Sequence, residues 1–268
     1  MSKLKDKVIV ITGATGVLCR AIALNLAENG ATVVCLARKK EAGDALVKEI
    51  TDKGGKAYFF TTDVTDIEKL KKNREEILAT CGTIDVLING AGGNMPGANV
   101  LPDQSLLDLD LDELRKAIDL NLYGTIYPTQ IFSEVMIRNK KGNIINFTSV
   151  TVDRPMTRVI GYSSAKAAIA NFTKWLAVEF AQKYGDQMRV NAIRPGFYLT
   201  EQNRSLLTNP DGSLTERGGK IINMTPMGRM GRPEELCGAV LYLCSDDSSF
   251  MNGQTITVDG GFETYSGV

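Results

Sequence analysis

The stretch VIVITGATGVLCRAIALNLAENG, from Val8 to Gly30, decides the fold. Its first five residues, Val8 to Thr12, are apolar or β-branched and predict a buried strand, and the last fourteen predict a helix. A glycine-containing turn joins the two, and backbone N–H groups at a helix start bind phosphate. The stretch therefore predicts the first unit of a nucleotide-binding fold. The predicted phosphate contacts are Gly13, Thr15, Gly16, Val17 and Leu18.

The glycines of this turn are not in the usual places. Gly13 keeps the first position, but Val17 and Cys19 replace the second and third. The second glycine normally lets the backbone approach a pyrophosphate, and the third allows close packing of helix against strand. Cys19 is small enough for the packing role, and Gly16, one residue early, can supply the flexibility. We expect a variant turn that still binds a dinucleotide.

Composition limits the other possibilities. The chain of 268 residues has 31 basic and 31 acidic residues, so nothing favours binding to nucleic acid or an anionic membrane. No apolar run reaches 18 residues, and MSKLKDK leads straight into a strand, which predicts a cytoplasmic protein without signal peptide or membrane span. The five cysteines form no CxxC pair and indicate reduced thiols.

Histidine is absent from the whole sequence. Its absence excludes Ser-His-Asp and Cys-His catalysis and removes the commonest zinc ligand, so we expect no metal site. Acid–base chemistry must use tyrosine, lysine, a carboxylate or water.

Short Val/Ile-rich runs alternate with longer helical stretches along the chain. Their nearly continuous hydrophobicity is typical of strands that are covered on both faces. We expect one domain over residues 1–268, a Rossmann-type, doubly wound α/β fold with a parallel sheet of about seven strands and helices on both faces. The predicted strands are Val8–Thr12, Thr32–Ala37, Lys56–Asp63, Ile84–Gly90, Gly142–Ser149, Met188–Pro195 and Gln254–Gly261.

Two irregular segments, Gly92–Glu113 and Phe197–Glu235, follow the fourth and sixth predicted strands. Open α/β sheets bind ligands beyond the carboxyl ends of their strands. We expect these segments, near 92–113 and 197–235, to form a substrate pocket and its lid. The alternative is that they are plain surface insertions.

The stretch FTSVTVDRPMTRVIGYSSAKAAIANF, from Phe147 to Phe172, carries the chemistry. Tyr162 and Lys166 are four residues apart in a helical pattern, so their side chains project from one face. Ser149 ends the preceding strand, thirteen residues before the tyrosine. A Tyr-x-x-x-Lys pair alone is weak evidence, but the strand-end serine and the glycine turn make the combination specific.

With these residues, the sequence resembles the short-chain dehydrogenase/reductase family over essentially its whole length. The resemblance implies hydride transfer between a nicotinamide cofactor and an alcohol or carbonyl. The family's catalytic positions correspond to Asn121, Ser149, Tyr162 and Lys166. Asn121 would hold a water that links Lys166 to solvent, although a cap or turn role is the alternative. The other matching residues are Thr12, Gly13, Asp63, Val64, Asn89, Gly90, Ala91, Gly92, Pro195, Gly196 and Thr200.

Physical chemistry supports these roles. Reduction of a ketone needs a hydride on carbon and a proton on oxygen, and tyrosine has an ordinary pKa of about 10. Proton exchange near pH 7 therefore requires about 4 kcal/mol of stabilisation of the phenolate. The Lys166 ammonium and the positive nicotinamide could supply it, and Lys166 could also hold the cofactor ribose. Ser149 would hydrogen-bond and orient the substrate oxygen.

The end of the second predicted strand addresses cofactor choice. An acidic residue there would bind the 2′-hydroxyl of NAD, but this chain has Ala37 followed by Arg38, Lys39 and Lys40. A guanidinium suits a 2′-phosphate, so NADP(H) is favoured, while NAD(H) stays possible. Arg38 to Lys40 could also be a solvated loop.

The resemblance places the remaining cofactor contacts. Asp63 and Val64 would hold the adenine edge, and residues Asn89 to Gly92 would pack beside the adenosine half. Thr200, which follows Pro195 and Gly196, is either a contact of the nicotinamide amide or a helix N-cap.

Several short segments resemble the D-mannonate oxidoreductase (fructuronate reductase) branch of the family. They are GVLC in the first turn, AGGN at Ala91–Asn94, PGFYLTEQNRSLL at Pro195–Leu207, SSF at Ser248–Phe250 and GGFETYSGV at the end. The resemblance implies a sugar acid as substrate. Such a site needs a cation for the carboxylate and amides for hydroxyls. The candidates besides Ser149 are Asn94, Arg154, Arg158, Gln202, Asn203 and Arg204, each of which could instead be a surface residue.

Two other functions stay open. One is reduction of a different carbonyl, such as a 3-oxoacyl thioester, a polyol-related ketone or a keto-gluconate. The other is a nicotinamide-binding sensor without turnover, for which the altered glycine turn is the only support. The resemblance also implies a homotetramer or homodimer.

Overall fold

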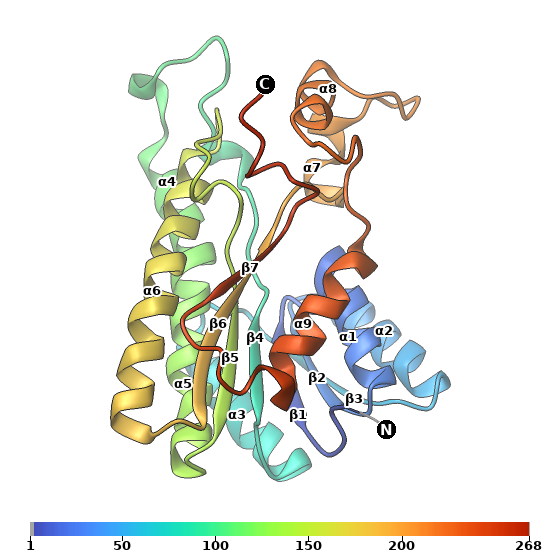
Figure 1. Ribbon diagram of the computed structural model, residues 1–268, viewed down its shortest axis with the longest axis vertical. Helices are drawn as coiled ribbons and strands as arrows, with labels where there is room; N and C mark the ends of the chain where they lie inside the picture. The colour runs from blue at the N-terminus through green and yellow to red at the C-terminus, as the bar shows by residue number, and fades with distance from the viewer. Residues whose placement is uncertain (1–2, 268) are drawn as a thin grey trace.

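The structure, a computed structural model, describes residues 3–267, with the side chains of residues 201 and 202 outside that description. Seven parallel strands form one sheet in the order β3-β2-β1-β4-β5-β6-β7 (Figure 1), which confirms the doubly wound α/β fold. The strands are β1 (Val8–Thr12), β2 (Thr32–Ala37), β3 (Lys56–Thr61), β4 (Val86–Asn89), β5 (Gly142–Phe147), β6 (Met188–Pro195) and β7 (Thr255–Val258).

Helices cover both faces of the sheet (Figure 1). One face packs against α1 (Val17–Glu28), α2 (Lys40–Asp52) and α9 (Cys237–Cys244), and the other against α3 (Ile67–Cys81), α5 (Gly124–Arg138) and α6 (Ile160–Tyr184). Along β1, Ile9 and Ile11 belong to the first core and Val8 and Val10 to the second. Because successive strand residues point to opposite faces, a strand between two helical layers must be apolar throughout.

Four of the predicted strands extend too far at their carboxyl ends, those starting at Lys56, Ile84, Gly142 and Gln254. The last residues of each leave the ladder and form the loops above the sheet. For example, the Gly90 and Ala91 amides donate to the side-chain Oγ1 of Thr12, on the neighbouring β1, at 3.1 Å rather than to a backbone carbonyl of that strand. The residues beyond the observed ends are threonine, serine, aspartate and glycine, so the predicted strands continue past the last apolar residues of the ladder.

The two irregular segments contain more helix than the sequence suggested. The first leads into α4 (Leu111–Ile118), and a π-helical turn over Asp119–Tyr123 joins α4 to α5. The second contains α7 (Glu201–Leu207) and α8 (Glu216–Asn223). Figure 1 shows both segments beyond the carboxyl ends of the strands, at the end of the molecule where the C-terminus lies.

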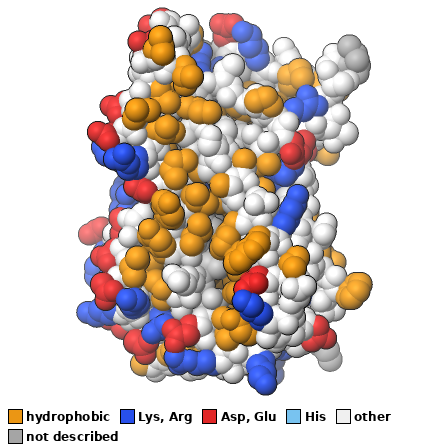
Figure 2. Space-filling model, turned by 90° about the vertical axis from the view of Figure 1, so that its left-hand side faces the viewer, with side chains coloured by type: hydrophobic (Ala, Val, Ile, Leu, Met, Phe, Trp, Pro, Cys, Tyr) orange, Lys and Arg blue, Asp and Glu red, His pale blue; other side chains and the backbone are white. Residues whose placement is uncertain are grey.

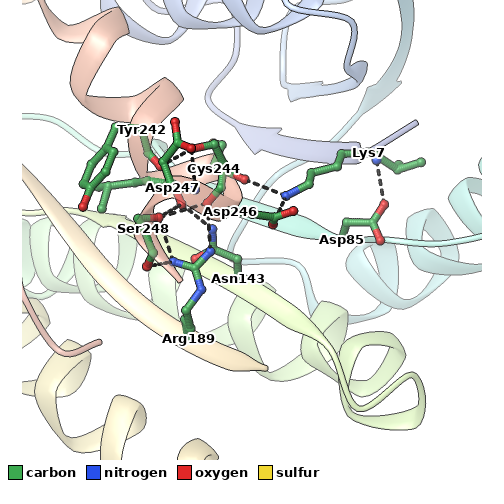
Figure 3. A network of polar contacts seen from close by, with 12 residues as sticks. Lys7, Asp85, Asn143, Arg189, Tyr242, Cys244, Asp246, Asp247 and Ser248 are labelled. Atoms are coloured by element: carbon green, nitrogen blue, oxygen red, sulfur yellow. Dashed lines mark hydrogen bonds and ion pairs between the residues drawn. The ribbon is translucent and has the colours of Figure 1, made fainter. Parts of the chain in front are cut away.

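A polar network closes the opposite end of the sheet (Figure 3). The buried Arg189 guanidinium, from β6, donates to the carbonyl and hydroxyl of Ser248 at 2.7 and 2.8 Å. Asn143, from β5, donates to the carbonyl of Leu243 at 2.6 Å, and Lys7 pairs with Asp246 at 2.7 Å. These contacts attach the end of α9 to three strands, far from the loops that carry the predicted chemistry.

Within residues 3–267, no helix is long and apolar enough to span a bilayer.

Candidate active site

A cavity of about 240 Å³ lies above the carboxyl ends of the central strands. Its wall combines the predicted catalytic side chains with parts of both irregular segments. Of the predicted site residues, Leu18, Gly90, Gly92, Asn94, Ser149, Tyr162, Lys166, Pro195, Gly196, Thr200 and Asn203 line it.

Ser149, Tyr162 and Lys166 meet on this wall. Ser149 lies just beyond the end of β5 and its hydroxyl is hydrogen-bonded to that of Tyr162, which is near the start of α6. One turn along the same helix, the Lys166 ammonium lies 5.5 Å from the centroid of the Tyr162 ring and donates to the carbonyl of Phe147 at 2.8 Å. The strand end and the helix start therefore bring the three predicted groups together.

Burial controls the protonation of this pair. Burial lowers the pKa of Lys166 to about 8, with a small opposing contribution from Cys19. Burial also raises the pKa of Tyr162 above its ordinary value, and the hydrogen bond with Ser149 offsets only part of that increase. In the protein alone the tyrosine is therefore a phenol near pH 7, which is the form that can donate a proton.

Asn121 lies in the π-helical turn, fully buried. Its amide nitrogen donates to the carbonyls of Gly93 and Ala117, and its amide oxygen accepts from the Gly93 N–H, all at 2.9 Å. A Cβ at Gly92 would lie 2.7 Å from the Asn121 amide oxygen and 3.5 Å from the Lys166 nitrogen. In this structure Asn121 positions the loop beside Lys166, and π-helical turns are frequent at functional sites.

The turn after β1 fits a pyrophosphate. Gly13 has φ +67°, and a Cβ there would lie 2.8 Å from the Cα of Ala91, so only glycine fits. No side chain caps the first turn of α1 and no acidic residue lies in it, across a helix that is described in full. Its N–H groups, beginning at Val17 and Leu18, are therefore free to bind an anion. Thr15 and Gly16 complete the turn.

The unusual position of Cys19 has a structural counterpart. Cys19 is buried and faces Gly90, the first residue after β4. A Cβ at Gly90 would lie 2.2 Å from the Cys19 sulfur and 3.0 Å from the Thr12 carbonyl oxygen. A glycine in the helix usually permits close packing of helix against strand. Here Gly90, on the loop after β4, permits the close packing of that loop against Cys19 of α1.

Asn89 was predicted to pack beside the adenosine half of the cofactor, but its side chain points into the protein. It is buried, and its amide donates to Thr129 Oγ1 and Asn146 Oδ1, both at 2.8 Å. The reason is its position as the last residue of β4, where a polar side chain between two helical layers must find internal partners. Asn89 thus joins β4 to α5 and β5.

The residues predicted to hold the adenine and its ribose lie beyond the ends of β2 and β3. Arg38, beyond β2, is exposed, and Asp63 is exposed while Val64 is buried. Partial burial raises the pKa of Asp63, but hydrogen bonds from Thr65 and the charge of Arg38 outweigh it and lower the pKa below its usual value. Arg38 therefore lies close enough to Asp63 to interact with it electrostatically.

Only some of the predicted substrate residues reach the cavity. Asn94 and Asn203 line it. The Asn203 side chain also holds the start of α7, since it accepts from the Thr200 N–H and donates to the Tyr198 carbonyl, both at 2.8 Å. Thr200 immediately precedes α7 and lines the cavity, so its position suits both of its predicted roles. The side chain of Gln202 lies outside the described residues.

The three predicted arginines lie elsewhere. Arg154 donates to the carbonyls of Glu263 (2.7 and 3.0 Å) and Tyr265 (2.6 Å) and so holds the C-terminal tail. Arg158 has φ +77° and does not line the cavity, and Arg204 is exposed on α7. Their order along the chain suggested the cavity, but Arg154 is held by the C-terminal tail and neither Arg158 nor Arg204 is among the residues that line the cavity.

Several cavity residues were missed from the sequence. Arg217, on α8, is the charged residue among them. It was missed because nothing in its local sequence distinguishes it from the other arginines. Thr151 also lines the cavity, and its hydroxyl oxygen is buried without a hydrogen-bond partner among the described residues. Thr151 follows Ser149 by two residues, and this proximity in the sequence could have indicated that Thr151 lies at the site. The apolar part of the wall includes Met156, Val159, Phe197, Tyr198, Leu206 and Leu207.

Comparisons with known proteins place this architecture in a family. A family model described as enoyl-(acyl carrier protein) reductase matches residues 13–263. An uncharacterised oxidoreductase of Bacillus subtilis, UxuB, is 45% identical over 274 residues, which cover 99% of this chain and 98% of that protein. The chain belongs to the short-chain dehydrogenase/reductase family and is an NAD(P)-dependent oxidoreductase.

Two solved structures are closely similar. One, from Haemophilus influenzae, is provisionally named a D-mannonate oxidoreductase and has bound NAD. It is 44% identical with a TM-score of 0.93 and covers 99% of this chain and 98% of its own. The other is a gluconate 5-dehydrogenase of Burkholderia cenocepacia in complex with NADP and tartrate, at 31% identity, TM-score 0.87 and coverage of 98% and 97%.

Proposed function

We propose that this chain interconverts the keto and hydroxyl forms of a sugar acid, with D-fructuronate and D-mannonate as the substrate pair. The observation that carries the proposal is the hydrogen-bonded Ser149–Tyr162 pair beside Lys166 on the cavity wall. The provisional name of the Haemophilus relative supports the choice of substrate. The buried, unpartnered hydroxyl of Thr151 adds a polar group suited to a polyhydroxylated substrate.

Each residue of the proposed site has a separate role in the reaction. The nicotinamide cofactor supplies or accepts the hydride when bound. Tyr162 Oη donates the proton to the substrate oxygen in reduction and removes it in oxidation, and Ser149 orients that oxygen by a hydrogen bond. The Lys166 ammonium stabilises the resulting phenolate because an opposite charge nearby favours the ionised form. Asn121 positions the Gly92–Asn94 loop that forms the neighbouring wall.

For the cofactor, we propose that NADP(H) is favoured and NAD(H) is also used. Ala37 leaves the end of β2 without a carboxylate, and the exposed Arg38 guanidinium is available for a 2′-phosphate. The related structures contain NAD in one case and NADP in another, which supports a fold that accommodates both. Arg38 also interacts with Asp63, which moderates its attraction for phosphate.

We also propose a homo-oligomer, a tetramer or a dimer. Figure 2 shows hydrophobic side chains gathered on the face formed by α4, α5 and α6. The exposed members include Tyr123 at the start of α5 and Ile160, Trp175 and Val178 on α6. Contiguous apolar patches on a protein surface commonly mark interfaces, which supports association through these helices.

The test is a spectrophotometric assay of D-fructuronate and D-tagaturonate reduction with NADPH and with NADH. We expect reduction of D-fructuronate, with the larger kcat/KM for NADPH. Turnover of a 3-oxoacyl thioester or of a neutral sugar ketone, without turnover of either uronate, would reject the substrate and retain the reaction class. Cofactor binding without turnover of any carbonyl would instead indicate the sensor.

A further inference from the structure

The charges around the cavity are one-sided. Among its described lining residues, the charged side chains are Lys166 and Arg217, and no carboxylate is present. Lys166 lies beside Tyr162 at the reacting end. Arg217 comes from α8, in the segment that follows β6, and so provides a second cation on a different element.

Arg217 is held in place by neutral groups. Its guanidinium donates to the hydroxyl of Thr157 at 3.1 Å and to the carbonyl of Thr157 at 3.3 Å. Thr157 belongs to the loop between Ser149 and Tyr162, so this contact joins α8 to the segment that connects β5 to α6. A guanidinium has five N–H groups, and Thr157 accepts two of them, which leaves donors for a ligand.

No carboxylate among the described residues forms an ion pair with Arg217. The nearest acidic residue in sequence, Glu216, pairs with Lys220 at 2.5 Å on the solvent side of α8. Burial lowers the pKa of Arg217, and the charge of Arg158 lowers it further. By contrast, Arg229 pairs with Glu235 at 2.7 Å and Arg194 pairs with Asp153 and Glu263.

A partly buried cation with a second cation nearby is unfavourable until an anion reaches it. The structure accepts this cost at Arg217, on the cavity wall, whereas Arg229 and Arg194 are neutralised by carboxylates. We propose that Arg217 binds the carboxylate of the substrate and so selects acids over neutral sugars. The inference rests on the proposed sugar-acid function and adds the residue that recognises the acid group.

The geometry also explains why selection would depend on α8. A planar guanidinium binds a carboxylate through two parallel hydrogen bonds, which fix direction as well as charge. Thr157 holds the Arg217 fork against the loop from β5, and Arg217 lines the same cavity as Ser149 and Tyr162. One substrate then connects the segments that follow β5 and β6.

Kinetics of Arg217→Gln test the proposal. We expect the KM for D-fructuronate to rise about 10- to 100-fold, as for loss of a charge-assisted hydrogen bond, with a much smaller change in kcat. Reduction of D-fructose, which has the same keto group without the carboxylate, should keep its wild-type kcat/KM. Arg217→Lys should be intermediate because it keeps the charge and loses the fork. Lys220→Gln, the same charge change on the outer side of α8, is the matched control.

A binding measurement separates this inference from the proposed function. Calorimetry of the enzyme–NADPH complex with D-mannonate and with the neutral D-mannitol needs no turnover. A wild-type preference for the acid that disappears in Arg217→Gln supports the inference even if fructuronate is not reduced. The inference is overturned if the wild type does not prefer the acid, or if Arg217→Gln retains the preference. It is also overturned if Thr157→Val reproduces the full defect, which would indicate that Arg217 only ties α8 to the loop.

Discussion

The predicted cofactor half and the predicted substrate half of the site are built in different ways. In the first, the turn after β1 and the loop after β4 pack so closely that a Cβ at Gly13 would lie 2.8 Å from the Ala91 backbone and one at Gly90 would lie 3.0 Å from the Thr12 carbonyl oxygen. In the second, long side chains from α7, α8 and the loop after β5 have several possible hydrogen-bond partners within reach. Backbone contacts depend on residue type at fixed spacings, whereas a long side chain can follow many directions. The first half is therefore easier to predict from sequence than the second.

Tyr162 lies where the two halves meet, and its variant should have the largest effect. Tyr162→Phe removes the proton donor without changing the ring, so we expect kcat to fall by at least about 10³-fold. The Kd for NADPH, measured by fluorescence titration, should change less than about 3-fold. Retained turnover would show that another group donates the proton.

Lys166 makes the stability of the fold depend on pH. Its pKa is about 8 in the folded protein against an ordinary 10.5, so below pH 8 both states carry the charge and the fold bears the full cost of burying it. Between pH 8 and 10.5 the unfolded chain binds more protons, and stability therefore rises with pH. Relative to Lys166→Met, the wild type should gain about 3 kcal/mol across this window.

Denaturant unfolding of both proteins at pH 7, 8, 9 and 10 measures this gain. Lys166→Met should also lose most of its turnover at every pH, which provides an independent readout of the same side chain. Parallel pH profiles of the two unfolding free energies would contradict the buried, charged state assigned to Lys166.

The contact between Cys19 and Gly90 tests the backbone packing of the cofactor half. Gly90→Ala should lower the unfolding free energy by about 1–3 kcal/mol, because its Cβ would overlap the Cys19 sulfur. Adding Cys19→Gly should recover a large part of the loss and restore NADPH binding. A double-mutant cycle in urea measures the coupling, for which we expect about 0.5–3 kcal/mol. Additive effects would mean that the two residues are not packed as described.

Arg154 provides the smallest expected effect and a direct contrast with Arg217. Arg154→Gln removes the donors to the Glu263 and Tyr265 carbonyls, so amide exchange in the tail after Asp259 should become faster. The KM for D-fructuronate should change less than about 3-fold. A rise in KM as large as that of Arg217→Gln, with unchanged tail exchange, would return Arg154 to the substrate site that the sequence suggested.

Local sequence predicted the elements well and the partners of long side chains poorly. Ser149, Tyr162 and Lys166 were predictable because a strand end and a helical i, i+4 spacing constrain where their side chains lie. The direction of the Asn89 side chain, inward toward Thr129 and Asn146, could not be predicted from its chain position. The strand starting at Ile84 was overextended because its local sequence does not mark Asn89 as the last residue of the ladder.

The sequence by itself determined the fold class and the reaction class and predicted the candidate catalytic side chains, because hydrophobic period, the glycine turn and the Tyr-x-x-x-Lys spacing are local properties. Only the tertiary structure decided which arginine faces the cavity. Arg154, Arg158, Arg204 and Arg217 are chemically equivalent, and each is within reach of the site along the chain. Their roles depend on which carbonyls and hydroxyls the folded backbone brings beside them, and those partners come from segments up to 111 residues apart.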